Sequence, residues 1–146
     1  MDPSIPVHIY DGKKLPFPDK SFDVIFVAFV LHHITHQDII VQELVRCARK
    51  KVLILEDTYD TPWQLLFTIW NDYHTNILQE YIKVWKGYSK PGVTDMPMPM
   101  TFRSVKGWKK FFSIFPLKLV DVSLRHSGYK PLSKVTFCLE LTEESN

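Results

Sequence analysis

The stretch VHIYDGKKLPFPDKSFDVIFVAFVL occupies residues 7–31, and His32 and His33 follow it directly. Its first four residues predict a short strand that ends at Asp11-Gly12, a turn dipeptide. Residues 22–30 are apolar on both faces, which is typical of a central strand covered on both sides in a parallel α/β sheet. The stretch therefore predicts two strands joined by a proline-containing loop, with a polar pair after the second strand.

A strand, helix, strand order continues from this point. Thr35 and Asp38 resemble a capping box and predict the start of a helix. Residues 52–56 (VLILE) predict a second buried strand, so the two strands should be parallel and joined by a right-handed crossover. The apolar residues at helical spacing between the strands are Ile40, Val41, Leu44, Val45 and Ala48.

The rest of the chain predicts two helices and a hairpin. Thr61-Pro62 is an N-cap followed by proline at the first helical position, and this helix should end before Gly87 or Pro91. Ser104 should cap a second helix that stops at Pro116. Alternating apolar residues then predict an antiparallel hairpin at the end of the sheet.

The composition limits the class of protein. The 146 residues are 45% hydrophobic and 14% aromatic with a net charge of +2, which indicates one globular domain and favours neither nucleic acid nor a membrane as partner. Cys47 and Cys138 lack metal-type spacing and are expected to be reduced. The first residues do not form a signal peptide, and the longest apolar run is too short to span a bilayer. We therefore expect a cytoplasmic protein.

Three local motifs resemble those of one enzyme family. They are Asp11 with Leu15-Pro16-Phe17, then Ser21-Phe22-Asp23 followed by VIFVAFVLHHI, and later MTFRSVKGWKKFF. Together they resemble the class I S-adenosylmethionine-dependent methyltransferases, in particular the type 11-like domain. The resemblance implies an α/β, partial Rossmann-like methyltransferase fold, with a mostly parallel sheet ending in an antiparallel C-terminal hairpin. Residues 1–146 would form one truncated domain, with about 60–100 as a helical lid or insertion.

The resemblance also implies S-adenosylmethionine as cofactor and assigns roles to residues near the strand ends. Each role has a plainer alternative, such as a turn, packing or a solvated charge. No metal site is expected, because adjacent residues of an extended segment, such as His32 and His33, point to opposite sides. The expected cofactor-binding residues are Asp11, Gly12, Ala28, Phe29 and His32; the expected catalytic residues are His33 and Glu56; and the expected substrate-binding residues are Tyr59 and Trp63.

Two features of the family are missing from this sequence. The glycine-rich turn, whose backbone N–H groups hold the methionine part of the cofactor, does not precede residues 7–31, and neither does the acidic residue that holds the ribose. Residues 22–30 should therefore form an exposed sheet edge that pairs with a second copy or with a separate N-terminal half. The expected function is methyl transfer to a small molecule; the alternatives are a non-catalytic binding or regulatory subunit and an inactive fragment.

Overall fold

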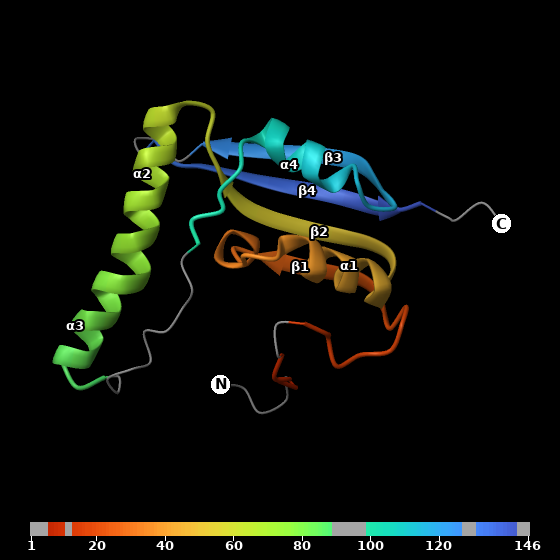
Figure 1. The fold of residues 1–146 in the computed structure, drawn as a ribbon, viewed down its shortest axis with the longest axis horizontal. Coiled ribbons are helices and arrows are strands. Elements are labelled where there is room, and N and C mark those ends of the chain that lie inside the picture. Colours follow the sequence, from red (N-terminus) through yellow and green to blue (C-terminus); the bar gives the residue numbers. More distant parts are fainter. Residues whose placement is uncertain (1–5, 11–12, 89–98, 127–130, 143–146) are drawn as a thin grey trace.

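The computed structural model describes residues 6–10, 13–88, 99–126 and 131–142. Within these ranges, the strands form one sheet in the order β1-β2-β4-β3 (Figure 1). The strands are β1 (Phe22–Ala28), β2 (Ala48–Thr58), β3 (Leu117–His126) and β4 (Ser133–Leu141). The helices are α1 (Gln37–Cys47), α2 (Pro62–Tyr73), α3 (Gln79–Trp85) and α4 (Val105–Phe112), with a 3₁₀ turn η1 (Leu31–His33) and a π-helical stretch η2 (His74–Leu78).

The sheet combines one parallel and two antiparallel pairings in the described part of the chain. β1 and β2 are parallel and joined through α1, as the sequence predicted. β4 pairs antiparallel with both β2 and β3, so the C-terminal hairpin is confirmed. The α/β class is confirmed as well, but the sheet is only partly parallel rather than mostly parallel.

One face of the sheet carries the core. Val52 and Ile54 of β2 lie opposite Leu139 and Phe137 of β4, and all four side chains are buried. Helices α1 and α4 pack on this same face, in front of the sheet in Figure 1. Trp108 of α4 is fully buried there. From Val52 to Thr58, buried residues of β2 alternate with partly buried ones, which is consistent with a sheet whose one face carries the core.

The other face of β1 is open in the described structure. Val24 and Phe26 are 49% and 60% exposed, whereas Ile25 and Val27, which alternate with them, pack against the core. β1 is also an edge strand of the sheet. The exposed edge is therefore confirmed, but the expectation that this strand is covered on both sides was wrong, because the described helices that pack on the sheet lie on one face.

Some local predictions fail for identifiable reasons. Residues 7–10 form no strand, because an isolated extended segment lacks the neighbouring strand that its backbone groups need. Helix α1 begins after His36, whose side chain makes no capping bond, so the box at Thr35 is not used. The caps at Thr61 and Ser104 are confirmed, since each hydroxyl accepts a backbone N–H three residues later.

Helices α2, η2 and α3 follow one another without interruption and form a long arm beside the sheet (Figure 1). The arm ends before Gly87, which takes a φ of 75° that suits glycine. None of the described helices is long and apolar enough to cross a membrane. The exposed aromatic residues of the arm are Trp63, Trp70, Tyr73, Tyr81 and Trp85.

Candidate functional site

A tight turn at the carboxyl end of β1 places the two histidines. Phe29 takes a left-handed φ of 55°, and its N–H donates to the carbonyl of Leu55 at 2.8 Å. The chain then enters η1 instead of continuing as a strand. The rings of His32 and His33 consequently pack together, with centroids 4.1 Å apart. The prediction that these rings point to opposite sides was wrong, because it assumed an extended backbone.

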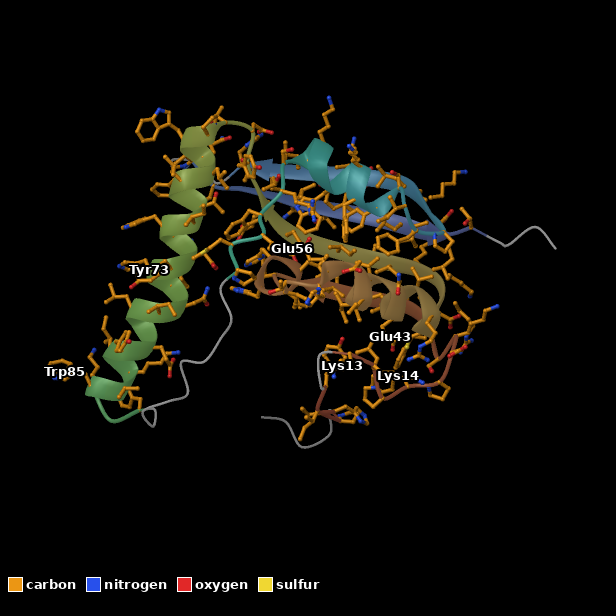
Figure 2. The ribbon with its side chains drawn as sticks, in the orientation of Figure 1. Lys13, Lys14, Glu43, Glu56, Tyr73 and Trp85 are labelled. Carbon is orange, nitrogen blue, oxygen red and sulfur yellow. The ribbon has the colours of Figure 1, made fainter. Side chains whose placement is uncertain are left out.

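Glu56, near the end of β2, holds the start of this turn. Its Oε1 accepts the backbone N–H groups of Val30 at 3.0 Å and Leu31 at 2.7 Å. Its Oε2 lies 2.5 Å from Nδ1 of His32. The side chain is fully buried, and Figure 2 shows it inside the body of the molecule. We expected Glu56 to face a substrate; in the described structure its carboxylate instead positions the turn and the ring of His32.

Asp72 of α2 contacts both histidines of this turn. Its Oδ1 lies 3.6 Å from Nε2 of His32 and 3.8 Å from Nε2 of His33. The same oxygen accepts a hydrogen bond from Nδ2 of Asn76 at 2.7 Å. Burial alone would lower the pKa of His32, but the carboxylates of Asp72 and Glu56 outweigh that effect and raise the pKa to about 9. The strand ends and the helical arm therefore meet at a buried, charged cluster.

Residues 99–104 close the cluster from another side. Nε2 of Gln37 donates to the carbonyl of Leu31 at 2.9 Å and to Oγ1 of Thr101 at 2.8 Å. Nε of Arg103 donates to Oε1 of Gln37 at 3.0 Å. The ring of Phe102 stacks on His32 with centroids 4.7 Å apart. These contacts fix η1 against Gln37, which follows it closely, and against residues 99–104, which lie about 70 residues later in the chain.

Sequence reasoning missed Gln37, Asp72 and Thr101. A signal was present for Asp72, because it lies three residues after Ile69 and so falls within the apolar stripe of its helix. An acidic residue at such a position must find a partner when it is buried. Thr101 offered no local signal, since its partners are about 70 residues earlier in the chain.

The other predicted site residues are dispersed. Asp11 and Gly12 lie outside the described residues. Ala28 and Phe29 are half-buried at the end of β1, and Nζ of Lys134 lies 4.7 Å from the centre of the Phe29 ring. Tyr59 is half-buried, whereas Trp63 is 80% exposed on the first turn of α2. The described structure thus brings His32, His33 and Glu56 together but leaves Trp63 facing solvent.

The described residues do not by themselves fit S-adenosylmethionine. The groove beside β1 has an almost wholly apolar lining, while the cofactor carries a carboxylate, an ammonium group and ribose hydroxyls that need polar partners. The two described glycines, Gly87 and Gly107, lie at the end of α3 and within α4, so neither forms a backbone cradle near β1. The groove is lined by residues that include Tyr10, Leu15, Phe22, Val24, Phe26 and Val30.

Comparison with known proteins supports the sequence resemblance. A family model described as a methyltransferase domain matches residues 2–55. The ubiquinone/menaquinone biosynthesis C-methyltransferase UbiE of Laribacter hongkongensis is 39% identical over 71 residues, which are 47% of this chain and 28% of that protein. UbiE of Burkholderia multivorans is 36% identical over 75 residues, or 50% of this chain and 30% of the relative. The match therefore spans less than a third of either relative.

Solved structures with low sequence identity share the fold. An S-adenosylmethionine-dependent methyltransferase from Methanosarcina mazei aligns with a TM-score of 0.57 at 16% identity, over 93% of this chain and 67% of that one. The YcgJ protein of Bacillus subtilis gives a TM-score of 0.57 at 14% identity, over 91% of this chain and 69% of its own. Both structures extend well beyond the part that this chain matches.

Proposed function

We propose that this chain forms the acceptor-side part of an enzyme that methylates a small molecule. Its resemblance to class I S-adenosylmethionine-dependent methyltransferases is supported by the family match over residues 2–55 and by its fold. S-adenosylmethionine is the cofactor of that family. The observation that carries the proposal is the open apolar edge of β1, which lies within the matched segment.

The names of the relatives support a small-molecule acceptor. Both are C-methyltransferases of ubiquinone and menaquinone biosynthesis. A carbon nucleophile on an aromatic or quinone-type ring is the corresponding acceptor class for this chain. Such an acceptor would suit an apolar site, and enzymes accelerate such transfers largely by positioning the two reactants.

The part that would hold the cofactor is proposed to come from a glycine-rich βαβ segment seated on the edge and open face of β1. This chain covers 67% and 69% of the two structural neighbours, so each contains further chain that the alignment does not include. A second copy of this chain would cover the edge but would bring no glycine-rich turn. A separate or preceding N-terminal half fits the chemistry better than a homodimer.

His33 is the residue of the cluster proposed to reach the acceptor. It is 13% exposed, whereas His32 and Glu56 are 2% and 0% exposed. Because parallel strands of open α/β sheets present ligands at their carboxyl ends, His33 lies on the rim where an acceptor would bind. Glu56 and His32 act behind it by fixing the turn.

The test is a calorimetric titration with S-adenosylhomocysteine. The chain alone should give no binding heat, and a mixture with the part of the Laribacter protein that precedes its matched region should give saturable binding. Phe26→Lys should abolish binding in the mixture, while Ile114→Lys, a change at another exposed apolar residue, should not. Tight binding by the chain alone, or no binding in any mixture, would overturn the proposal.

A non-catalytic subunit is the second candidate. The groove beside β1 offers few polar partners for the cofactor, and a regulatory subunit that does not bind the cofactor would need none. That alternative predicts that the mixture forms without binding S-adenosylhomocysteine. Sedimentation of the same samples distinguishes this result from a failure to associate.

A further inference from the structure

The cluster at the end of β1 brings two histidine rings to one carboxylate oxygen. Nε2 of His32 and Nε2 of His33 both approach Oδ1 of Asp72, at 3.6 and 3.8 Å. These separations are longer than hydrogen bonds between nitrogen and oxygen. One nitrogen from each ring and one carboxylate oxygen nevertheless lie within 4.8 Å of one another. Three potential ligand atoms thus surround a common point.

The spacing suits a divalent metal ion. Nitrogen and oxygen ligands lie about 2.0–2.2 Å from zinc, so two such ligands in a tetrahedral site are roughly 3.3 Å apart. The two nitrogen–oxygen distances, 3.6 Å from His32 and 3.8 Å from His33, lie close to that value. The residue types, two imidazoles and one carboxylate, are a set that binds zinc and other divalent transition metals.

The surroundings orient His32 as a metal ligand. Glu56 holds Nδ1 of His32, so Nε2 is the ring nitrogen directed at Asp72. Metal-binding histidines commonly pair their other ring nitrogen with a carboxylate, which fixes the ring and makes the ligand nitrogen more basic. Stacking against Phe102 further restricts the ring. The carboxylates of Glu56 and Asp72 also favour positive charge at this point.

We propose that His32, His33 and Asp72 form a binding site for a divalent transition metal ion, with zinc as the expected occupant and Glu56 as the residue that orients His32. Three protein ligands leave a fourth position for water or for an oxygen of a bound molecule, which is the pattern of catalytic rather than structural zinc sites. The site lies at the carboxyl ends of β1 and β2, on the rim where His33 is proposed to face the acceptor. The proposal stands on this geometry alone and does not depend on methyl transfer.

The experiment is a titration of the full chain with Co²⁺, which gives visible absorption when it replaces zinc in such a site, followed by zinc competition against a chromogenic chelator. One equivalent should bind. His33→Gln and Asp72→Asn should remove the tetrahedral cobalt spectrum, and Glu56→Gln should weaken zinc binding by about 10- to 100-fold. His36→Gln is the matched control, because His36 is exposed, lies close in sequence and is not part of the cluster.

Circular dichroism and urea unfolding of each variant show whether it is folded. Asp72→Asn keeps the size of the side chain, so it serves as the test variant if His33→Gln fails to fold. Failure of the folded wild-type chain to bind one equivalent of either metal would overturn the proposal. Equal binding by folded wild type and folded His33→Gln or Asp72→Asn would overturn it too, as would loss of binding in His36→Gln.

Discussion

Oε2 of Glu56 lies 2.5 Å from Nδ1 of His32, and both side chains are closed to solvent. Few contacts in the described chain join two ionisable groups at such depth. The pair connects the end of β2 to the turn after β1, so it fixes the relative position of two parallel strand ends.

Glu56→Gln should destabilise the chain strongly. The change leaves His32 buried beside a weaker partner and alters the acceptor for two backbone N–H groups. Breaking a buried ion pair by removing one partner costs about 3–5 kcal/mol. Glu140→Gln is the control, because its ion pair with Lys51 is partly exposed and should contribute less than about 1 kcal/mol. Urea unfolding measures both, and equal effects would contradict the argument.

Glu43→Gln should lower stability in a pH-dependent way. The guanidinium of Arg46 and the N–H of Leu15 hold the pKa of the Glu43 carboxyl below its ordinary value of 4.5. The stabilisation is therefore present above that value and is lost as the pH falls through the lower folded-state pKa. Wild type and variant should differ in unfolding midpoint at pH 7 and converge in acid. A constant difference at all pH values would assign the effect to packing.

Thr61→Ala and Ser104→Ala remove the same kind of helix cap but should differ in consequence. Each hydroxyl accepts one backbone N–H, and such a cap contributes about 1 kcal/mol to its helix. Helix α4 carries core residues Trp108 and Phe112, so Ser104→Ala should lower global stability. Thr61→Ala should mainly speed hydrogen exchange in the first turn of α2. A larger global loss from Thr61→Ala would contradict this difference.

Phe26→Lys should reduce self-association without destabilising the fold. Phe26 is 60% exposed on the open face of an edge strand, and charged residues on edges oppose strand pairing. An exposed substitution of this kind usually changes stability by about 0.5 kcal/mol or less. Ile114→Lys, at a 70% exposed residue in the turn between α4 and β3, is the comparison. Light scattering at rising protein concentration should show less association for Phe26→Lys than for Ile114→Lys. Equal association of the two variants would exclude the β1 edge as the surface through which copies associate.

The elements with local signals were predictable from sequence, and the contacts between them were not. The caps at Thr61 and Ser104, the parallel pair β1–β2 and the final hairpin each follow from short patterns. The sharp turn at Phe29 has no such pattern, because a left-handed φ is unexpected at an aromatic residue. That turn sets the direction of both histidine rings.

The site residues that the sequence did not predict were missed because their contacts also depend on tertiary packing. Asp72 reaches His32 only because α2 runs past the end of the sheet, and this course depends on tertiary packing. Gln37 and Thr101 meet across 64 residues of chain. A sequence pattern identifies a polar residue within an apolar stripe, but it does not identify the partner.

The helical arm formed by α2, η2 and α3 extends from the cluster of His32, His33 and Asp72. Trp85, at the far end of the arm in Figure 2, lies 13 residues beyond Asp72, which corresponds to roughly 20 Å of helix. Asp72 is the residue of the arm that contacts the two histidines. A tilt of the arm by about 10° at Asp72 would move its tip through roughly 3 to 4 Å, a displacement that a fluorescent label on the tip can register.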